Sequence, residues 1–202
     1  MEWKSLMEQE MIVVNNPDGS LHYPRIGYML QHDHLFEWRT IFQNVTLGPE
    51  IHHALTPERI AYVNQLLSDY GLEQFKNKRP SELSGGMKQR AALIRTLALD
   101  PQLLLLDEPF SALDYQTRLM VSSDICSLIR KAGKTMIIVT HDLSEAISLA
   151  DKVYVLSSRP ATIKAVLPIR LTLQDASPLA ARNAPEFPYY FKKLWEELTD
   201  ET

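Results

Sequence analysis

Two carboxylates and a histidine follow apolar segments that have the length of buried strands. Asp107 and Glu108 come directly after the run "LLLL", and His141 follows "IIVT". Adjacent carboxylates repel each other unless a cation lies close by, which predicts a Mg²⁺ ion held by Asp107. Glu108 then has the chemistry of a general base for a water molecule. His141 has that of a group that contacts a transferring phosphoryl oxygen.

A second candidate site lies at the start of a predicted helix. Ser84 is a typical N-cap, and Gly85 and Gly86 leave the first backbone N–H groups of the helix accessible to an anion such as phosphate. The chain has no segment of the form G-x-x-x-x-G-K-[ST]. The closest approach, "AGKT", has Leu128 where a glycine is needed, and a strand rather than a helix is predicted after it.

The elements that must position these groups alternate between strands and helices. Apolar strands without alternation, "LLLLD" and "TMIIVT", are predicted to be buried on both faces. The order strand, helix, strand, helix, strand favours one parallel sheet with helices on its faces and reactive groups at the carboxyl ends of its strands. The strands are expected at residues 25–31, 103–107, 135–140 and 152–156, and helices at 57–70, 84–100 and 115–131.

Composition excludes several classes of protein. A net charge of -4 over 202 residues gives no overall attraction to nucleic acid or to anionic lipid. The single cysteine, Cys126, excludes an internal disulfide and fits a reducing compartment. Apolar runs are too short to span a bilayer, so membrane association is expected only through a partner. Phe36 and Trp38 stand in a predicted loop and require such a partner or a core.

The motifs together resemble the nucleotide-binding subunit of ATP-binding cassette (ABC) transporters over residues 25–171. The motifs that carry the resemblance are Gln31 after its strand, "LSGGMKQR", "LLLLDEP", "SALD" and "THD". The resemblance implies an α/β fold with a P-loop NTPase-like parallel sheet flanked by helices. It also implies an ATPase domain at 1–171 with a helical signature subdomain at about 40–98, followed by a tail at 172–202 with a short helix.

The resemblance further implies ATP and Mg²⁺ as cofactors and a role for each residue at the sheet. Gln31 is expected to ligate Mg²⁺ and sense the attacking water, and Asp107 to hold Mg²⁺ through a water molecule. Glu108 is expected to be the general base and His141 the switch residue that contacts the phosphate.

The same resemblance assigns the "SGG" helix start to a dimer. Ser84, Gly85, Gly86 and Gln89 are expected to bind the γ-phosphate region of an ATP held mainly by a second nucleotide-binding subunit. Asp114, at the end of "SALD", is expected to communicate across that dimer. Met87 replaces the glutamine usual after the signature glycines, a change that some importer subunits share.

One part of the family pattern is missing. The glycine-rich phosphate loop and the aromatic residue that stacks on adenine precede the glutamine strand in the family, and neither is present here. We therefore expect an N-terminally truncated cassette, produced by a misplaced start, a disrupted gene or deliberate shortening. Lys4 and Ser5 stand at the interval expected for the end of the loop, but Trp3 replaces its glycine.

The segment after Gln31, with Phe36 and Trp38, resembles the part that receives the coupling helix of a membrane permease. With "SSRPATI" it is similar to importer subunits for nitrate, sulfonate, taurine or thiamine-precursor pyrimidines, among which the sequence does not choose. The implied location is peripheral, on the cytoplasmic face of the plasma membrane. A catalytically inactive fragment or subunit that only binds partners is the alternative. Chromosome-maintenance ATPases fit poorly, because no heptad repeat separates Gln31 from Leu83.

Overall fold

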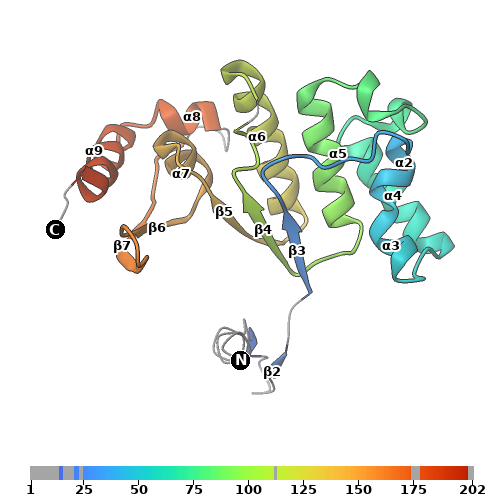
Figure 1. Ribbon diagram of the computed structural model, residues 1–202. Coiled ribbons are helices and arrows are strands. Elements are labelled where there is room, and N and C mark those ends of the chain that lie inside the picture. The colour runs from blue at the N-terminus through green and yellow to red at the C-terminus, as the bar shows by residue number, and fades with distance from the viewer. Residues whose placement is uncertain (1–13, 16–20, 23–24, 112, 174–177, 200–202) are drawn as a thin grey trace.

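The computed structural model describes residues 14–15, 21–22, 25–111, 113–173 and 178–199 (Figure 1). The strands are β1 (Val14–Asn15), β2 (Leu21–His22), β3 (Ile26–Met29), β4 (Leu103–Asp107), β5 (Thr135–Val139), β6 (Lys152–Leu156) and β7 (Ile163–Pro168). The helices are α2 (Ile41–Val45), α3 (Leu47–Ile51), α4 (Pro57–Asp69), α5 (Gly85–Leu97), α6 (Tyr115–Lys131), α7 (Leu143–Leu149), α8 (Pro178–Arg182) and α9 (Phe187–Thr199), with 3-10 turns η1 (Glu73–Phe75) and η2 (Pro80–Glu82).

The central sheet has the order β3-β4-β5, and all its pairings are parallel. Met29 pairs with Leu106 and Asp107 with Val139, so the carboxyl ends of the strands form one edge. The predicted parallel sheet is thus confirmed for these strands. The strand predicted at residues 152–156 is confirmed as β6. Its predicted place in the parallel sheet is wrong, because β6 pairs with β7 in a separate antiparallel sheet among the described residues.

Side-chain caps start the main helices where the sequence predicts them. Thr56 Oγ1 accepts a hydrogen bond from Arg59 N at the start of α4, and Gly71 ends this region with a positive φ. Ser84 Oγ accepts from Met87 N at the start of α5. Each helix therefore begins at a residue that satisfies one of its own free N–H groups.

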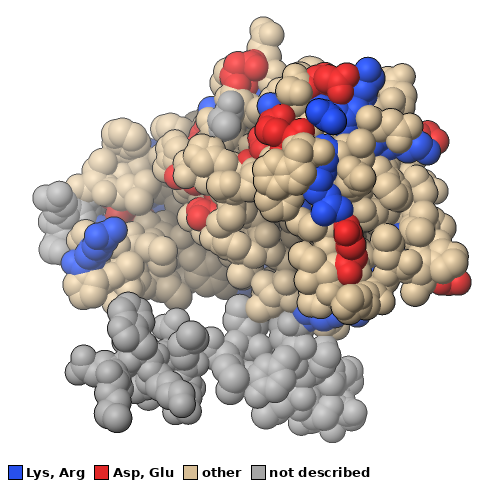
Figure 2. Space-filling view, turned by 45° about the vertical axis from the view of Figure 1, so that its right-hand side comes forward, with Lys and Arg blue, Asp and Glu red and all other residues tan. Residues whose placement is uncertain are grey.

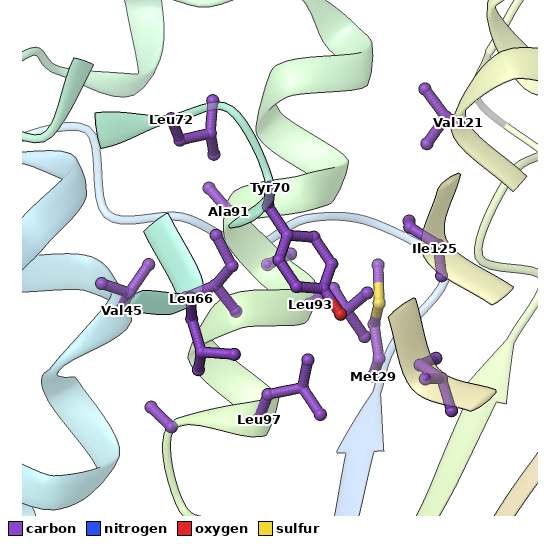
Figure 3. Close-up of a cluster of buried hydrophobic side chains, with 14 of the residues drawn as sticks. Met29, Val45, Leu66, Tyr70, Leu72, Ala91, Leu93, Leu97, Val121 and Ile125 are labelled. Atoms are coloured by element: carbon purple, nitrogen blue, oxygen red, sulfur yellow. The ribbon is translucent and has the colours of Figure 1, made fainter. Parts of the chain in front are cut away.

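The main core lies between one face of the central sheet and the helices α4, α5 and α6, as Figure 3 shows for Met29, Leu66, Leu93 and Ile125. The other face is exposed: Tyr28 and Ile137 are 54% and 49% accessible. The prediction that residues 135–140 are buried on both faces is therefore wrong, because β5 alternates between exposed and half-buried residues. In β4 the burial is nearly complete, with Leu105 half-buried.

A second, smaller core joins the C-terminal helix to β6 and β7. Its buried members are Ile147, Val155, Leu167 and Leu194, and Lys164 Nζ donates to Glu197 O. No helix within the described ranges is long and apolar enough to cross a bilayer. Figure 2 shows acidic and basic side chains intermixed on the face that it draws.

Candidate active site

The carboxyl edge of the central sheet brings three of the predicted residues together. Gln31 follows β3, Glu108 follows β4 and His141 follows β5. Gln31 Nε2 donates to Glu108 Oε2 at 2.9 Å, and His141 Nδ1 lies 2.9 Å from Glu108 Oε1. Glu108 is thus held from both sides by residues from the neighbouring strands, and we name these residues the edge cluster.

The backbone of Glu108 departs from the strand geometry before it. Its φ of 43° lies in the left-handed region, which is unfavourable for a residue other than glycine. Hydrogen bonds hold it there: Glu108 N donates to Val139 O at 2.8 Å, and Ser111 Oγ donates to Glu108 O at 3.0 Å. This turn directs the side chain toward Gln31 and His141, away from the line of β4.

Asp107 lies beside the edge cluster with a different partner. Tyr28 OH donates to Asp107 Oδ2 at 3.2 Å. The pKa of the Tyr28 phenol is raised, through desolvation first and then through the charge of Asp107. Asp107 and the amide oxygen of Gln31 are hard oxygen ligands at adjacent strand ends, and they fit Mg²⁺, which takes few protein ligands and keeps several waters. No cluster of three or more His, Cys, Asp or Glu ligands occurs among the residues described.

The "SGG" helix start is divided between exposed and buried residues. Ser84 and Gly85 are exposed at the N-terminus of α5, where free N–H groups suit an anion. Gly86 is buried, and a Cβ on it would lie 3.0 Å from Thr117 Cγ2, so this glycine allows α5 to approach α6 closely. Gln89 is 2% exposed, which keeps its side chain away from any ligand on the surface of this chain.

Asp114 starts α6, and two residues that the sequence did not predict, Arg118 and Glu145, lie beside the edge cluster. Asp114 is the N-cap of α6, and the pKa of its carboxyl is lowered, mainly by its hydrogen bond with Thr117. Arg118 and the buried Glu145 line a small pocket together with Glu108 and others. The sequence position of Arg118 could have indicated that it has a specific partner. An arginine near the N-terminus of a helix is unfavourable because of the helix dipole unless an acceptor holds it.

The loop with Phe36 and Trp38 is exposed but rigidly supported. The two rings contact each other at a centroid distance of 4.8 Å with their planes tilted by 34°, and Trp38 is 72% accessible. Asn44, fully buried, accepts from Phe36 N at 2.7 Å and donates to the carbonyl groups of Phe36, Arg39 and Thr40. One buried amide therefore fixes the loop and leaves its aromatic rings facing outward.

Comparison with known proteins decides the family. The model of the ABC transporter family matches residues 8–111, more than half of the 202 residues. The chain belongs to the ABC transporter family. The match includes Gln31 and Glu108 of the edge cluster, the "SGG" helix start and β4, and it ends before His141.

Among curated ABC relatives, the uncharacterized ABC transporter ATP-binding protein YtlC of Bacillus subtilis is 47% identical over 173 residues, covering 86% of this chain and 66% of its own length. The nitrate import ATP-binding protein NrtD of Synechocystis is 40% identical, covering 83% and 65%. The taurine import ATP-binding protein TauB of Jannaschia is 42% identical, covering 68% and 51%. The chain thus spans slightly less than two thirds of the first two relatives.

Solved structures confirm the predicted fold class. A dimeric ATP-binding cassette, MJ0796 in a post-hydrolysis state bound to ADP and Pi, aligns with a TM-score of 0.59 at 30% identity, over 72% of this chain and 63% of that one. CbiO1 from Clostridium perfringens aligns with a TM-score of 0.58 at 30% identity, over 64% and 52%. The predicted phosphate-loop remnant, Lys4 and Ser5, lies outside the described residues.

Proposed function

We propose that this chain is the ATP-binding and ATP-hydrolysing subunit of an ABC importer, which energises the uptake of a small solute through a partner permease. The observation that carries the proposal is the edge cluster, in which Gln31 and His141 each hold one oxygen of Glu108 at 2.9 Å. An importer is favoured because the relatives with named solutes, NrtD and TauB, are import proteins.

In this proposal Glu108 is the general base for ATP hydrolysis. Each carboxylate oxygen accepts one hydrogen bond and keeps a lone pair for the attacking water. When Glu108 Oε1 accepts a hydrogen bond from His141 Nδ1–H, Nε2 can donate to the γ-phosphate only if the imidazole carries a second proton. Mg²⁺, held by Gln31 and through water by Asp107, would supply charge neutralisation for the phosphates.

A second nucleotide-binding subunit completes the site in this proposal. Ser84 and Gly85 offer the exposed N-terminus of α5 to the γ-phosphate of ATP bound by that subunit. Asp114 lies in the loop that faces the same interface. The dimeric state of the related cassette bound to ADP and Pi supports this arrangement. Gln89 fits it least, since its side chain is buried.

The permease is proposed to contact the loop of Phe36 and Trp38, which places the subunit peripherally on the cytoplasmic face of the inner membrane. The exposed ring of Trp38 and the fixed backbone beneath it support this contact. Trp38→Ala is expected to weaken co-purification with the permease, whereas Trp195→Ala, at another exposed tryptophan, is expected to leave it unchanged. Equal loss in both variants would contradict the assignment.

The test of hydrolysis uses Glu108→Gln, which keeps the size of the side chain and removes the base. Release of phosphate from MgATP is expected to fall by about 10²- to 10⁴-fold, the usual contribution of a general base. The control is Glu73→Gln, at an exposed glutamate of η1, with an unchanged rate. A Glu108→Gln variant that hydrolyses ATP as fast as the original chain would refute the proposed base.

One observation favours a second candidate, an inactive subunit that only binds partners. These 202 residues include no G-x-x-x-x-G-K-[ST] segment, the segment that supplies backbone and lysine donors to the β- and γ-phosphates of ATP. Hydrolysis of MgATP by this chain alone supports the first candidate. The second is supported if the chain alone is inactive but changes the ATPase rate of a complete ABC subunit mixed with it, and if Ser84→Ala abolishes that change.

We also propose the division of the chain into an ATPase domain at 1–171, with its helical subdomain at about 40–98, and a tail at 172–202. The helices α2 to α5 fall within the proposed subdomain, and α9 within the tail.

A further inference from the structure

The imidazole of His141 is weakly held, but the turn that carries it is firmly held on both sides. The side chain is 73% accessible, and Glu108 is its hydrogen-bond partner. Before it, Thr140 Oγ1 donates to Glu145 Oε2 at 2.7 Å and accepts from Asp142 N. After it, Asp142 Oδ1 caps α7 by accepting from Ser144 N at 2.8 Å. The position of His141 therefore depends on what holds Thr140 and Asp142.

Arg118 connects this turn to the loop at residues 111–114. Its Nη1 lies 3.4 Å from Asp142 Oδ2, and its Nη2 donates to Leu113 O at 3.1 Å. Its side chain is 25% accessible and stands near the N-terminus of α6, where the helix dipole disfavours a cation. A planar guanidinium can hold two acceptors in fixed directions, which the single ammonium of a lysine cannot do.

These contacts close a ring that starts and ends at Glu108. Glu108 O accepts from Ser111 Oγ, and Leu113 N donates to Phe110 O, next to Ser111. Arg118 joins Leu113 to Asp142, and the neighbouring His141 returns to Glu108 Oε1. Among the residues that the structure describes, Arg118 is thus the side chain that joins Leu113 to the turn of His141.

We propose that Arg118 is a positioning residue that links the loop at residues 111–114 to the His141 turn, so that a displacement of the loop changes the position of His141 relative to Glu108. The proposal rests on the proposed function for its effect on hydrolysis, while the link itself is independent of it. Arg118 also lies among carboxylates: Asp142 is its partner, and its charge acts on the buried Glu145, whose pKa is raised mainly by burial. Removal of Arg118 leaves these carboxylates to repel each other.

The chain supplies a matched control at the other end of the same helix. Arg130 Nη2 donates to Leu149 O at 2.9 Å and pairs with Asp151 at 3.7 Å. Arg130 thus makes the same kinds of contact as Arg118, to one backbone carbonyl and one aspartate, but at the C-terminal end of α6 and α7. Loss of stability through a missing arginine contact is expected in both Arg118→Ala and Arg130→Ala, and loss of positioning only in the first.

Hydrogen exchange tests the link without any catalysis. Arg118→Ala is expected to speed amide exchange in both residues 111–114 and residues 140–144, and Arg130→Ala to speed it in neither. Arg118→Lys keeps the charge and is expected to fold as the original chain does, yet to speed exchange in at least one of the two segments. Unchanged exchange in both segments of Arg118→Ala and Arg118→Lys would overturn the proposal, whether or not the chain hydrolyses ATP.

Kinetics tests the consequence if the chain is active. Arg118→Ala is expected to lower kcat by about 10- to 100-fold with little change in KM, because a misplaced group impairs the reacting geometry more than binding. In the His141→Ala background the same change is expected to cost no more than about two-fold, since the residue it positions is gone. Additive losses in the double variant would overturn the proposed route through His141. An inactive original chain together with faster exchange in Arg118→Ala would refute the proposed function and retain the link.

Discussion

The two faces of the central sheet carry similar apolar residues, but helices cover only one of them in the part of the chain that the structure describes. Met29, Leu104 and Leu106 point to the face covered by α5 and α6, and each is nearly inaccessible. On the other face Tyr28 and Ile137 are about half accessible. In Figure 1, β3 and β4 lie in front of α6, which covers the sheet from behind.

The difference shows that the apolar composition of a strand does not establish that both of its faces are covered. Parallel strands in proteins are usually covered on both faces, and the composition of "TMIIV" in β5 meets that requirement. Within the part of the chain that the structure describes, only one of the two faces has that cover. The hydroxyl of Tyr28 and the carboxylate of Asp107 meet at the other face, so one of the proposed Mg²⁺ residues lies beside exposed apolar side chains.

The largest expected contrast is between Leu104→Ala and Ile137→Ala. Leu104 is fully buried, so its truncation is expected to lower the free energy of unfolding by about 2–5 kcal/mol through lost burial and a cavity. Ile137 is 49% accessible, and its truncation is expected to cost less than about 1 kcal/mol. Urea unfolding followed by circular dichroism measures both. Equal losses would show that the second face is covered in solution.

The single thiol gives an independent measure of the same contrast. Cys126 is buried in α6 on the covered side, and burial raises the pKa of its thiol to about 12. A thiol reagent is therefore expected to reach it only through unfolding. Leu104→Ala is expected to speed its labelling, and Ile137→Ala to leave the labelling rate nearly unchanged.

Much of this fold could be predicted from local signals. The helix predicted at residues 57–70 is α4, because Thr56 and Pro57 start it and Gly71 ends it through backbone geometry alone. Residues 115–131 and the strand at 103–107 agree with the structure at both ends. The gathering of Glu108 and His141 was also predictable, since the carboxyl ends of parallel strands share an edge.

The features of the fold and of the site that the sequence did not predict depend on contacts between distant segments. Nothing in "KVYVL" shows whether it pairs with β5 or with the following strand, since both pairings satisfy its backbone. The burial of Gln89 follows from packing of α5, which its polar type does not indicate. The bridge made by Arg118 needs Leu113 and Asp142 at once, and only the folded chain brings them together.

Gly27→Ala, at the covered face, is expected to cause an intermediate loss of stability. A Cβ on Gly27 would lie 2.7 Å from Thr96 Cγ2 and 2.9 Å from Pro101 Cγ, so neighbouring groups must move. The expected loss is about 1–3 kcal/mol in the free energy of unfolding, measured by urea titration. Thr96→Ser removes the closest atom and keeps the hydroxyl that donates to Ala92 O, so it is expected to restore part of the loss in the double variant. If Thr96→Ser restores no stability, the loss in Gly27→Ala does not come from contact with Thr96.

The smallest expected effect concerns Asp114, which caps the helix that covers the sheet. Its folded-state pKa is lowered, chiefly by the hydrogen bond with Thr117, so its charge stabilises the fold above the ordinary value of 3.8, and this stabilisation is lost as the pH falls through the folded-state pKa. Asp114→Asn keeps a capping oxygen without the charge. Its melting temperature is therefore expected to lie slightly below that of the original chain at about pH 7 and to approach it at about pH 3. Asp114→Ala, which loses the cap itself, is expected to remain below the original chain at both pH values. An Asn variant whose deficit is the same at both pH values would show that the charge of Asp114 adds nothing to the covered side.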